Sequence, residues 1–503
     1  MNMKCNYYII VLISIVGIII PQRMCSQQTL TLDDCRKLTL ENNEQLKMSN
    51  IKNKIAGDAL NSTRSLYYPK INLTGSYVHT SKSISILNDE QKNTISNFGT
   101  SLASSLSQSV PELLTTLVTQ GIITPAQAQG LGQIAAGSIP GLSENLNEVG
   151  EKIVDAFRTD TRNVWLGAVT LVQPVYTGGR ISNANKIAAI NKDLTTNEIE
   201  QTQYRLINNT DNAYWLVVSL HNKHKLAESY HELLLKLESD VKKMVAEGVA
   251  TKSDELSVSV KVNEAEMTLV QVEDGLVLAK KALCNVCGIP LDTEFRLDDE
   301  DKDIANDLFD YDIDFQTVLA NRPEMKMLRN AEDIANKSIS LAKADYLPTI
   351  ALTAGYTYTN PNLYNGFKRK FGGMWNVGVV LNMPLSNLWE NRSKVNMARS
   401  SATLAQLKIA DASNLIDLQV QQDRYKLSEA RKKLLLTEKN ISKANENLHS
   451  ANTGFSEGVF TATTVMEAQT AWLKAKNLQI DAQIEVKLAV SSLHKSLALP
   501  IGM

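Results

Sequence analysis

The sequence predicts a mainly α-helical fold with a smaller β part, built from two copies of one structural unit. The first observation is an internal repeat, because Trp165 aligns with Trp375 and Pro290 with Pro500 when the chain is shifted by 210 positions. The second is a pair of very long proline-free stretches in each copy, which predict helices too long for a globular core. The third is a pair of short apolar–polar alternations in each copy, which is the period of a β-strand.

The first copy carries an insertion that the second lacks. Earlier positions align at a shift of 279, with Leu40 on Leu319 and Pro69 on Pro348. The two shifts differ by 69, so an insertion of about that length lies between Pro69 and Trp165. A period this long indicates two related units rather than a short-repeat solenoid. The expected organisation is a first copy at 27–290, an acidic linker at 291–314 and a second copy at 315–503.

The N-terminus has the pattern of a secretory signal peptide. Lys4 precedes an apolar run that ends before Pro21, and small or polar residues follow. The run is shorter than the ~20 apolar residues of a spanning helix. We expect residues 1–26 to be removed, with lipid attachment at Cys25 as the alternative. No later segment is apolar for 18 residues, so no transmembrane helix is expected in the mature chain.

The composition argues against nucleic-acid binding and against a disulfide scaffold, and it favours no particular function. A net charge of −2 leaves no basic footprint for nucleic acid. The mature chain has too few cysteines for a disulfide scaffold, namely Cys35, Cys284 and Cys287. Cys284 and Cys287 share one helical face, where we expect two small buried side chains. A redox C-x-x-C motif is the alternative, although its context is not thioredoxin-like.

In each copy, the sequence pattern predicts two strands of about ten residues. This is the length that a tilted strand needs to cross a bilayer. The expected strands are about 70–79, 164–173, 349–359 and 374–383. Aromatic residues lie near both ends of these strands, as in the two interfacial girdles of a membrane β-protein. They are Trp165 and Trp375 at one end, and Tyr68, Tyr176 and Tyr346 at the other. Two ordinary soluble hairpins are the alternative.

Four strands are too few to close a membrane barrel, because the smallest single-chain barrels have about 8. Open sheet edges are not tolerated in lipid. If these strands span a membrane, several copies of the chain therefore share one barrel. Three copies would supply twelve strands.

The remaining segments predict one long loop and several helices. The insertion, about 80–160, is rich in Ser, Thr, Gln and Gly and is expected to be extracellular, with room for short helices of its own. Residues 30–66 predict a single helix that Pro69 ends. The long helices are expected in antiparallel pairs that pack side by side, at about 180–246 with 251–287, and 390–453 with 463–497.

Few groups of residues in the sequence have a spacing that could form a catalytic or metal-binding site. His221, His224, Glu228 and His231 have helical spacing but lack the H-E-x-x-H pattern, so we expect polar surface rather than a metal site or an enzyme. The acidic run 298–301 does not have EF-hand spacing, and a solvated linker or girdle is expected there. We expect no cofactor and find no nucleophile-elbow or dinucleotide motif.

Together these residues resemble the TolC-like family of outer-membrane efflux proteins over nearly the whole mature chain. The most specific stretches are 40–46 (LENNEQL), 174–180 (PVYTGGR) and the two helix turns at 247–251 (EGVAT) and 457–461 (EGVFT). The resemblance implies a homotrimer. Its twelve-strand β-barrel would cross the outer membrane and continue as a twelve-helix α-barrel through the periplasm.

The resemblance also implies roles for residues at the two turns. The helix tips would dock a periplasmic adaptor protein through Gly248, Val249, Thr251, Gly458, Val459 and Thr461. The second turn would narrow the periplasmic entrance. Glu467 matches an acidic position of the family, Thr464 stands where another aspartate is common, and Phe460 would add bulk.

The implied function is passive conduction of small molecules, such as drugs and toxic compounds, from an inner-membrane pump and its adaptor to the outside. The pump would be proton-driven or ATP-driven and would supply the energy. An exit duct for type I polypeptide secretion is the close alternative. A periplasmic coiled-coil scaffold and an enzyme built on the histidine cluster are more distant ones.

Overall fold

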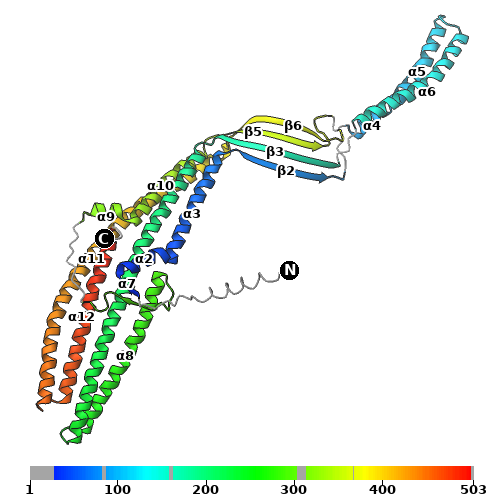
Figure 1. Cartoon of the computed structure of the whole chain (residues 1–503). Coiled ribbons are helices and arrows are strands. Elements are labelled where there is room, and N and C mark those ends of the chain that lie inside the picture. Colours follow the sequence, from blue (N-terminus) through cyan, green and yellow to red (C-terminus); the bar gives the residue numbers. More distant parts are fainter. Residues whose placement is uncertain (1–27, 82–86, 158–161, 303–312, 366–367, 500–503) are drawn as a thin grey trace, which may run out of the picture. The chain divides into compact units, whose positions relative to one another are not determined.

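The computed structural model describes residues 28–81, 87–157, 162–302, 313–365 and 368–499. The expected signal peptide and Cys25 lie outside the described residues, as does part of the expected acidic linker. The chain forms two compact units, one of strands with the insertion and one of long helices. The mainly α fold with a small β part is therefore confirmed (Figure 1).

The strand unit contains one antiparallel sheet in the order β2–β3–β5–β6 (Figure 1). These strands correspond to the four expected from the sequence: β2 is Lys70–His79, β3 is Asn163–Tyr176, β5 is Thr349–Asn360 and β6 is Gly372–Asn382. Short 3-10 turns lie beside the sheet at Ser65–Tyr67 and Leu385–Asn387. Consecutive strands of each copy pair directly, so the duplication is visible as two hairpins joined through β3 and β5.

The register of the sheet separates an apolar face from a polar face. Across the four strands, Leu73, Val169, Tyr356 and Trp375 lie opposite one another in one row. The neighbouring row consists of Asn72, Thr170, Gly355 and Asn376. Because successive side chains of a strand point to opposite faces, one face is lined by apolar residues and the other by polar or small ones.

The insertion forms helices that are longer than expected. They are α4 (Asp89–Ser96), α5 (Phe98–Thr119) and α6 (Pro125–Ala156), and α5 and α6 make an antiparallel hairpin (Figure 1). Capping boxes begin α4 at Asn88 and α6 at Thr124, where Pro125 occupies the first helical turn. The insertion thus holds helices, as expected, but α5 and α6 are longer than the short helices predicted, because these local start signals outweigh the Ser- and Gly-rich composition.

The helical unit consists of two long helical hairpins and the shorter helices beside them. The long helices are α7 (Arg180–Ala246), α8 (Lys252–Cys287), α11 (Leu388–Ser456) and α12 (Ala462–Ser496). Strands β1 (Gln28–Leu30) and β4 (Phe295–Leu297) pair in parallel. No described helix is both long enough and apolar enough to cross a membrane.

The expected helix at 30–66 is two helices, which corrects the sequence prediction. Helix α2 (Leu32–Asn42) and helix α3 (Glu44–Arg64) are separated by Asn43, whose backbone is extended. The Asn43 amide donates to the Val286 carbonyl, in the last turn of α8, at 2.9 Å. Carbonyls of a last helical turn lack partners within their own helix, so this contact favours the break.

The second copy breaks at the equivalent position, 279 residues later. Helix α9 (Phe315–Asn321) and helix α10 (Pro323–Ala344) are separated by Arg322. Proline disfavours helical backbone in the residue before it, which explains the break. The Arg322 guanidinium donates to the Lys495 carbonyl in the last turn of α12 at 3.3 Å. Both copies thus join the broken helix to the end of a long helix.

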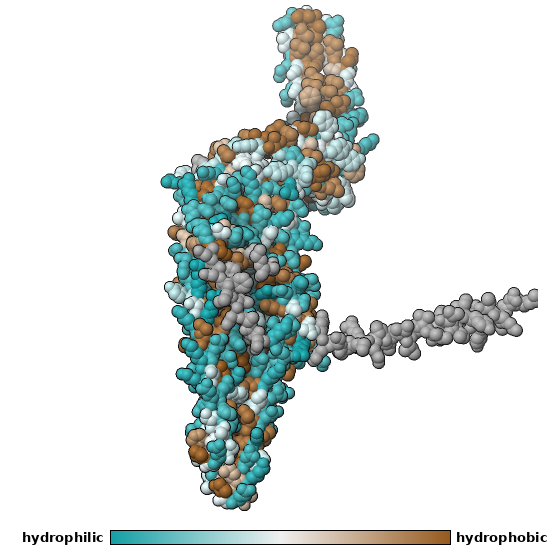
Figure 2. Space-filling model, turned by 60° about the vertical axis from the view of Figure 1, so that its left-hand side comes forward, coloured by the Kyte–Doolittle hydropathy of each residue, from teal (hydrophilic) through white to brown (hydrophobic). Residues whose placement is uncertain are grey.

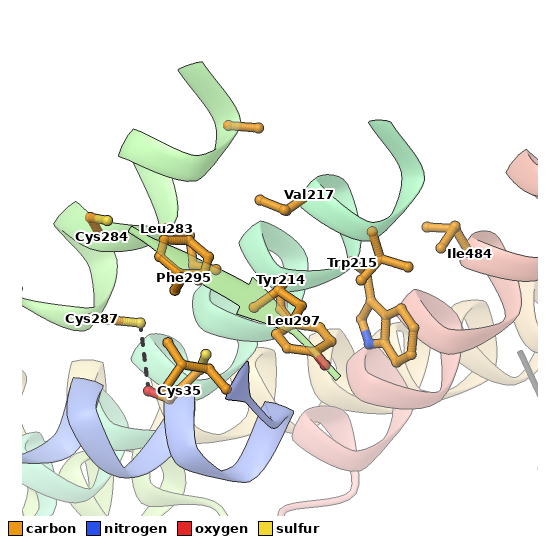
Figure 3. Close-up of a cluster of buried hydrophobic side chains, with 13 residues drawn as sticks. Cys35, Tyr214, Trp215, Val217, Leu283, Cys284, Cys287, Phe295, Leu297 and Ile484 are labelled. Atoms are coloured by element: carbon orange, nitrogen blue, oxygen red, sulfur yellow. Dashed lines mark hydrogen bonds between the residues drawn. The ribbon is translucent and has the colours of Figure 1, made fainter. Parts of the chain in front are cut away.

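A buried cluster fixes the middle of the first copy (Figure 3). It contains Tyr214 and Trp215 of α7, and Cys284 and Cys287 of α8, with Cys35 of α2. All three cysteines are buried free thiols, and the Cys287 thiol donates to the Cys35 carbonyl at 3.7 Å. The expectation of small buried side chains at Cys284 and Cys287 is confirmed.

Candidate functional site

The first candidate site is the turn between α7 and α8. Gly248 has φ +77, a conformation that glycine adopts without steric cost. The Val249 N–H donates to the Met244 carbonyl at 2.8 Å, so the turn closes the last turn of α7. The Val249 side chain is 69% exposed. The turn therefore presents an apolar side chain on a fixed backbone.

Thr251 begins α8 with a reciprocal capping box. The Asp254 N–H donates to the Thr251 hydroxyl at 3.2 Å, and the Thr251 N–H donates to Asp254 Oδ2 at 3.0 Å. The hydrogen bonds from the Thr251 hydroxyl and backbone lower the pKa of Asp254. Two N–H groups that a helix start leaves unpaired are thus satisfied by one residue pair.

The second turn repeats the backbone of the first, with Phe460 in place of Ala250 and Thr464 in place of Asp254. Gly458 has φ +76, and the Val459 N–H donates to the Gly454 carbonyl at 2.8 Å. Thr461 caps α12 by accepting from the Thr464 N–H at 3.4 Å. Thr464 occupies the position of Asp254, so it supplies no carboxylate to complete a capping box.

The expected entrance residues lie on and beside the first turns of α12. The Phe460 ring lies against Gly454, where an added Cβ would come within 2.3 Å of the ring. Thr464 and Glu467 are three residues apart and share one helix face. Glu467 is exposed, whereas its neighbours Met466 and Ala468 are buried. The acidic side chain thus faces away from the packed interior of the chain.

A buried cluster behind the turns joins the two hairpins. It brings Leu234 and Val241 of α7 together with Val258 of α8 and with Val465 and Met466 of α12. Apolar burial of this kind holds both turns at the same end of the helical unit. Val459 is 71% exposed beside its turn, as Val249 is beside the first. The result is a pair of similar tips, each with an exposed valine.

The second candidate site is the sheet with its aromatic ends. Trp165 packs against Tyr77 of the neighbouring strand, with ring centroids 4.5 Å apart. Trp375 lies opposite Tyr356 and is 73% exposed. Both tryptophans belong to the half of the sheet where β2 ends and β6 begins.

The three tyrosines predicted for the other girdle lie at the opposite end. Tyr68 lies two residues before β2, and Tyr346 lies three residues before β5. A register irregularity after Pro174 places Tyr176 opposite Ile350, on the apolar face of the sheet. Such a bulge changes which residue of a strand lies opposite its partner. The sheet therefore carries aromatic residues at both ends.

The histidine cluster does not assemble as a metal site in the described part of the chain, where no group of three ligands lies close enough to hold an ion. His224 faces Glu228 at 3.5 Å on the same helix. His221 instead turns to the acidic segment, with Nδ1 3.7 Å from Glu300 Oε2 and Nε2 3.6 Å from Asp301 Oδ1.

The acidic segment is only partly the solvated linker that the sequence predicts. Glu300 is 2% exposed, and Lys280 and Arg296 lie 3.9 Å from its carboxylate. Asp299 accepts a hydrogen bond from the Tyr214 hydroxyl at 2.6 Å. A buried carboxylate needs nearby positive charge, which explains why this part of the segment folds onto the helices.

A second buried ion pair was not predicted from the sequence. Both oxygens of Asp211 accept from the Arg36 guanidinium at 2.8 Å, and Asp211 is 1% exposed. Such a two-point contact fixes the angle between α2 and α7 as well as their distance. The only sequence feature that could have indicated this buried carboxylate is its position, between Thr210 and the apolar run at 213–218.

Comparison with known proteins identifies the family. The family model for the outer membrane efflux protein matches residues 136–288 and 315–499, which is two thirds of the chain. The chain therefore belongs to the outer membrane efflux protein family. The family is one of outer-membrane channels of Gram-negative bacteria, which places this protein in the outer membrane with a part that extends into the periplasm.

Curated relatives match over limited segments. The outer membrane protein TolC of Vibrio cholerae is 25% identical over 172 residues, which are 34% of this chain and 39% of that protein. The cation efflux system protein CusC of Escherichia coli K12 is 30% identical over 81 residues, which are 16% and 18% of the two chains. The chain thus spans less than half the length of the curated relatives that it matches.

Solved structures match over nearly the whole chain. The CmeC outer membrane channel of Campylobacter jejuni has a TM-score of 0.71 at 13% identity, covering 93% of this chain and 85% of that one. The outer membrane protein VceC of Vibrio cholerae has a TM-score of 0.67 at 14% identity, covering 93% and 96%. At such low identity the likeness shows a common fold.

Proposed function

We propose that this protein is the outer-membrane exit duct of a tripartite export system, through which small molecules pass passively from an inner-membrane pump. One observation carries the proposal. Among the described residues, a sheet with an apolar face and a polar face ends in two edge strands without a further partner strand, β2 and β6. This sheet is continuous in sequence with two long helical hairpins.

The sheet needs other copies of the chain to complete it. Unpaired strand edges are costly in lipid, because their N–H and C=O groups find no partners there. Three copies supply twelve strands, and joining β2 of one copy to β6 of the next removes every edge. The apolar row with Leu73 and Trp375 then faces lipid, and the polar row with Asn72 and Asn376 faces the lumen.

The helical hairpins supply the periplasmic part of this duct. Four long helices per chain make twelve in a trimer, and their similar tips meet the adaptor protein. In this arrangement Gly248, Val249 and Thr251 of one tip, and Gly458, Val459 and Thr461 of the other, form the docking surface. Their fixed turns and exposed valines support the assignment, because apolar side chains on rigid backbone are typical anchors of protein interfaces.

The periplasmic entrance is assigned to the first turns of α12. Three symmetry-related Glu467 carboxylates around the axis repel one another and attract cations. Thr464 removes a second ring of charge, and Phe460 adds bulk beside it. The duct opens when the tips spread on adaptor binding.

The entrance is tested by conductance of the purified protein in planar bilayers. We expect Glu467→Lys to lower the selectivity for cations and to weaken block by multivalent cations. Glu144→Lys, which changes the same charge in the insertion, is the matched control and should leave both properties unchanged. Unchanged conductance and unchanged ion block in Glu467→Lys would contradict the assignment of the periplasmic entrance to Glu467.

The cargo is tested by affinity capture from cross-linked cells, followed by identification of the inner-membrane partner. A proton-driven pump with an adaptor supports export of small molecules such as drugs and toxic compounds. Recovery of an ATP-driven exporter alone would contradict export of small molecules and would indicate type I polypeptide secretion instead. Extraction of the chain without detergent would instead favour a periplasmic coiled-coil scaffold and contradict the duct.

A further inference from the structure

The helical hairpin of the insertion has a packed base. An added Cβ at Gly99 would lie 2.2 Å from the Ser143 carbonyl oxygen, and the Asn147 side chain accepts from the Thr100 N–H at 3.1 Å. Its amide also donates to the Thr100 hydroxyl at 2.7 Å. The hairpin is thus a specific element of structure rather than a loop that happens to be helical.

Helix α6 carries a second apolar face that no part of this chain covers among the described residues. Its inner face packs on α4 and α5 through residues such as Ile139, Leu146 and Gly150. A separate row of exposed apolar side chains follows the helical repeat along the flank beside this inner face. This outer stripe consists of Leu131, Ile134, Leu142, Val149 and Ile153. Figure 2 shows apolar surface on the projecting hairpin.

The charge pattern of the hairpin fits contact between identical surfaces. No charged residue occurs between Glu112 and Glu144, which covers the end of α5, the turn and the first half of α6. Further along α6, the acidic residues Glu144, Glu148 and Asp155 lie on a face away from the outer stripe. Lys152 lies at the edge of the stripe, where its charge is paired with Glu148 at 2.5 Å. Around a symmetry axis each residue lies near its own copies, so a charged stripe would repel itself and an uncharged one does not.

The connection to the sheet places the hairpins of different copies near one another. The insertion leaves β2 and enters β3 at adjacent positions, where the Thr80 N–H donates to the Arg162 carbonyl at 2.8 Å. In a shared barrel, three hairpins therefore emerge from the same rim. This step rests on the trimer of the proposed function.

We propose that the outer stripes of α6 from three copies pack against one another around the threefold axis. The three hairpins then form a six-helix bundle beyond the membrane, with the outer stripes of α6 at its axis. Helix α6 has 32 residues, which gives the bundle a length of about 48 Å. The hairpin thus joins the copies at the extracellular end of the assembly.

Cross-linking of the full-length protein in detergent tests the packing. Leu142→Cys is treated with a short bifunctional maleimide, and Gln133→Cys, which is exposed on the opposite side of the same helix, is the matched control. The unmutated protein gives the background of native thiols, of which Cys35, Cys284 and Cys287 are buried. We expect covalent dimers from Leu142→Cys and only background from Gln133→Cys.

A second variant tests the charge argument. Adding Ile134→Lys to Leu142→Cys should lower the yield of covalent dimer several-fold, because three lysines then meet near the axis. Circular dichroism checks that the helices persist. An unchanged yield would contradict the axial packing.

The native mass of the same preparation separates this inference from the proposed function. A three-chain mass with no preference for Leu142→Cys over Gln133→Cys overturns the bundle and leaves the duct intact. A single-chain mass overturns both. A cross-link in cells from Leu142→Cys to another polypeptide, without covalent dimers of this chain, assigns the stripe to a foreign partner and overturns the bundle as well.

Discussion

Gly288 and Ala498 occupy equivalent positions of the two copies, 210 residues apart, and each follows a long helix with positive φ. Gly288 has φ +68 and Ala498 has φ +50. A left-handed backbone costs a residue with a Cβ roughly 1–2 kcal/mol, whereas glycine adopts it freely. The second copy therefore carries strain that the first avoids.

This difference predicts opposite effects for two exchanges. We expect Ala498→Gly to raise the thermal unfolding midpoint, with a gain of about 1 kcal/mol from the relieved backbone. Gly288→Ala should lower the midpoint by more, because its Cβ would also lie 2.8 Å from the backbone of Asn42. Thermal unfolding in detergent, followed by circular dichroism, measures both. A lower midpoint in Ala498→Gly would contradict the argument.

The buried group around His221 predicts a dependence of stability on pH. Burial lowers the pKa of His221 from 6.5, more than the Glu300 carboxylate raises it, and Lys225, Lys280 and Arg296 lower it further. As pH falls below about 6.5, the unfolded chain therefore binds a proton before the folded chain does. Stability is fully present above that pH and is lost as pH falls through the folded pKa.

We expect His221→Gln to weaken the loss of thermal stability between about pH 7 and about pH 5. His449→Gln, at an exposed position of α11, is the control and should retain the dependence of the parent protein. Unfolding curves at several pH values give the comparison. Equal slopes for the parent and His221→Gln would mean that another group controls the acid sensitivity.

Single residues were predictable where a local pattern decides their place. The glycines of the two turns follow from the repeated turn sequence of the two copies. The burial of Cys284 and Cys287 follows from their spacing along one helix. The burial of Glu300 does not, because its acidic neighbours suggest solvent. One of the positive charges that balance it, Lys280, belongs to the separate helix α8, although Arg296 is only four residues away. Asp211 is similar, since only the fold brings Arg36 to it.

At the scale of elements, the alternation of the strands gives their faces and the repeat gives their order. The break at Asn43 was missed because asparagine is tolerated inside helices, and the contact that favours the break comes from α8. The signal was nevertheless present in the other copy, where Pro323 marks the equivalent break. The insertion helices were underestimated because composition was given more weight than their capping residues.

The two faces of the sheet predict different responses to charge. Leu73 is 81% exposed on the apolar face, and Thr74 is its neighbour on the polar face. We expect Leu73→Arg to reduce assembly in the outer membrane, since arginine near the bilayer midplane costs ~2–4 kcal/mol. Thr74→Arg should assemble normally because the proposed barrel turns the polar face to the lumen. The yield of trimer in outer-membrane fractions is the measurement, and equal yields would refute the assignment of faces.

At the scale of the whole molecule, backbone hydrogen bonds within the sheet itself hold its register up to the insertion. The ladder between β2 and β3 runs to His79 and Asn163, and the bond between Thr80 and Arg162 continues it. The loop is therefore not needed to align the strands, and surface loops tolerate large changes of length.

We expect a variant with residues 87–157 replaced by a short Gly-Ser linker to reach the outer membrane and conduct ions. Heat-resistant oligomers in membrane fractions and bilayer conductance are the two readouts. A chain in which only Thr80 and Arg162 are exchanged for glycine serves as the control for the sheet end. Failure of the shortened chain to accumulate would show that the insertion is required for folding.

The distal half of α7 extends far beyond the buried cluster at its middle, so a small tilt at the cluster would give a large displacement at the tip. About 32 residues separate Tyr214 from Ala246, which is an arm of roughly 48 Å at 1.5 Å per residue. A tilt of about 6° at the cluster would displace the tip by about 5 Å, close to one turn of helix. A small change of packing around Tyr214 and Trp215, if the distal cluster of Leu234 and Val241 moved with the helix, would thus become a displacement of several ångströms at the tip.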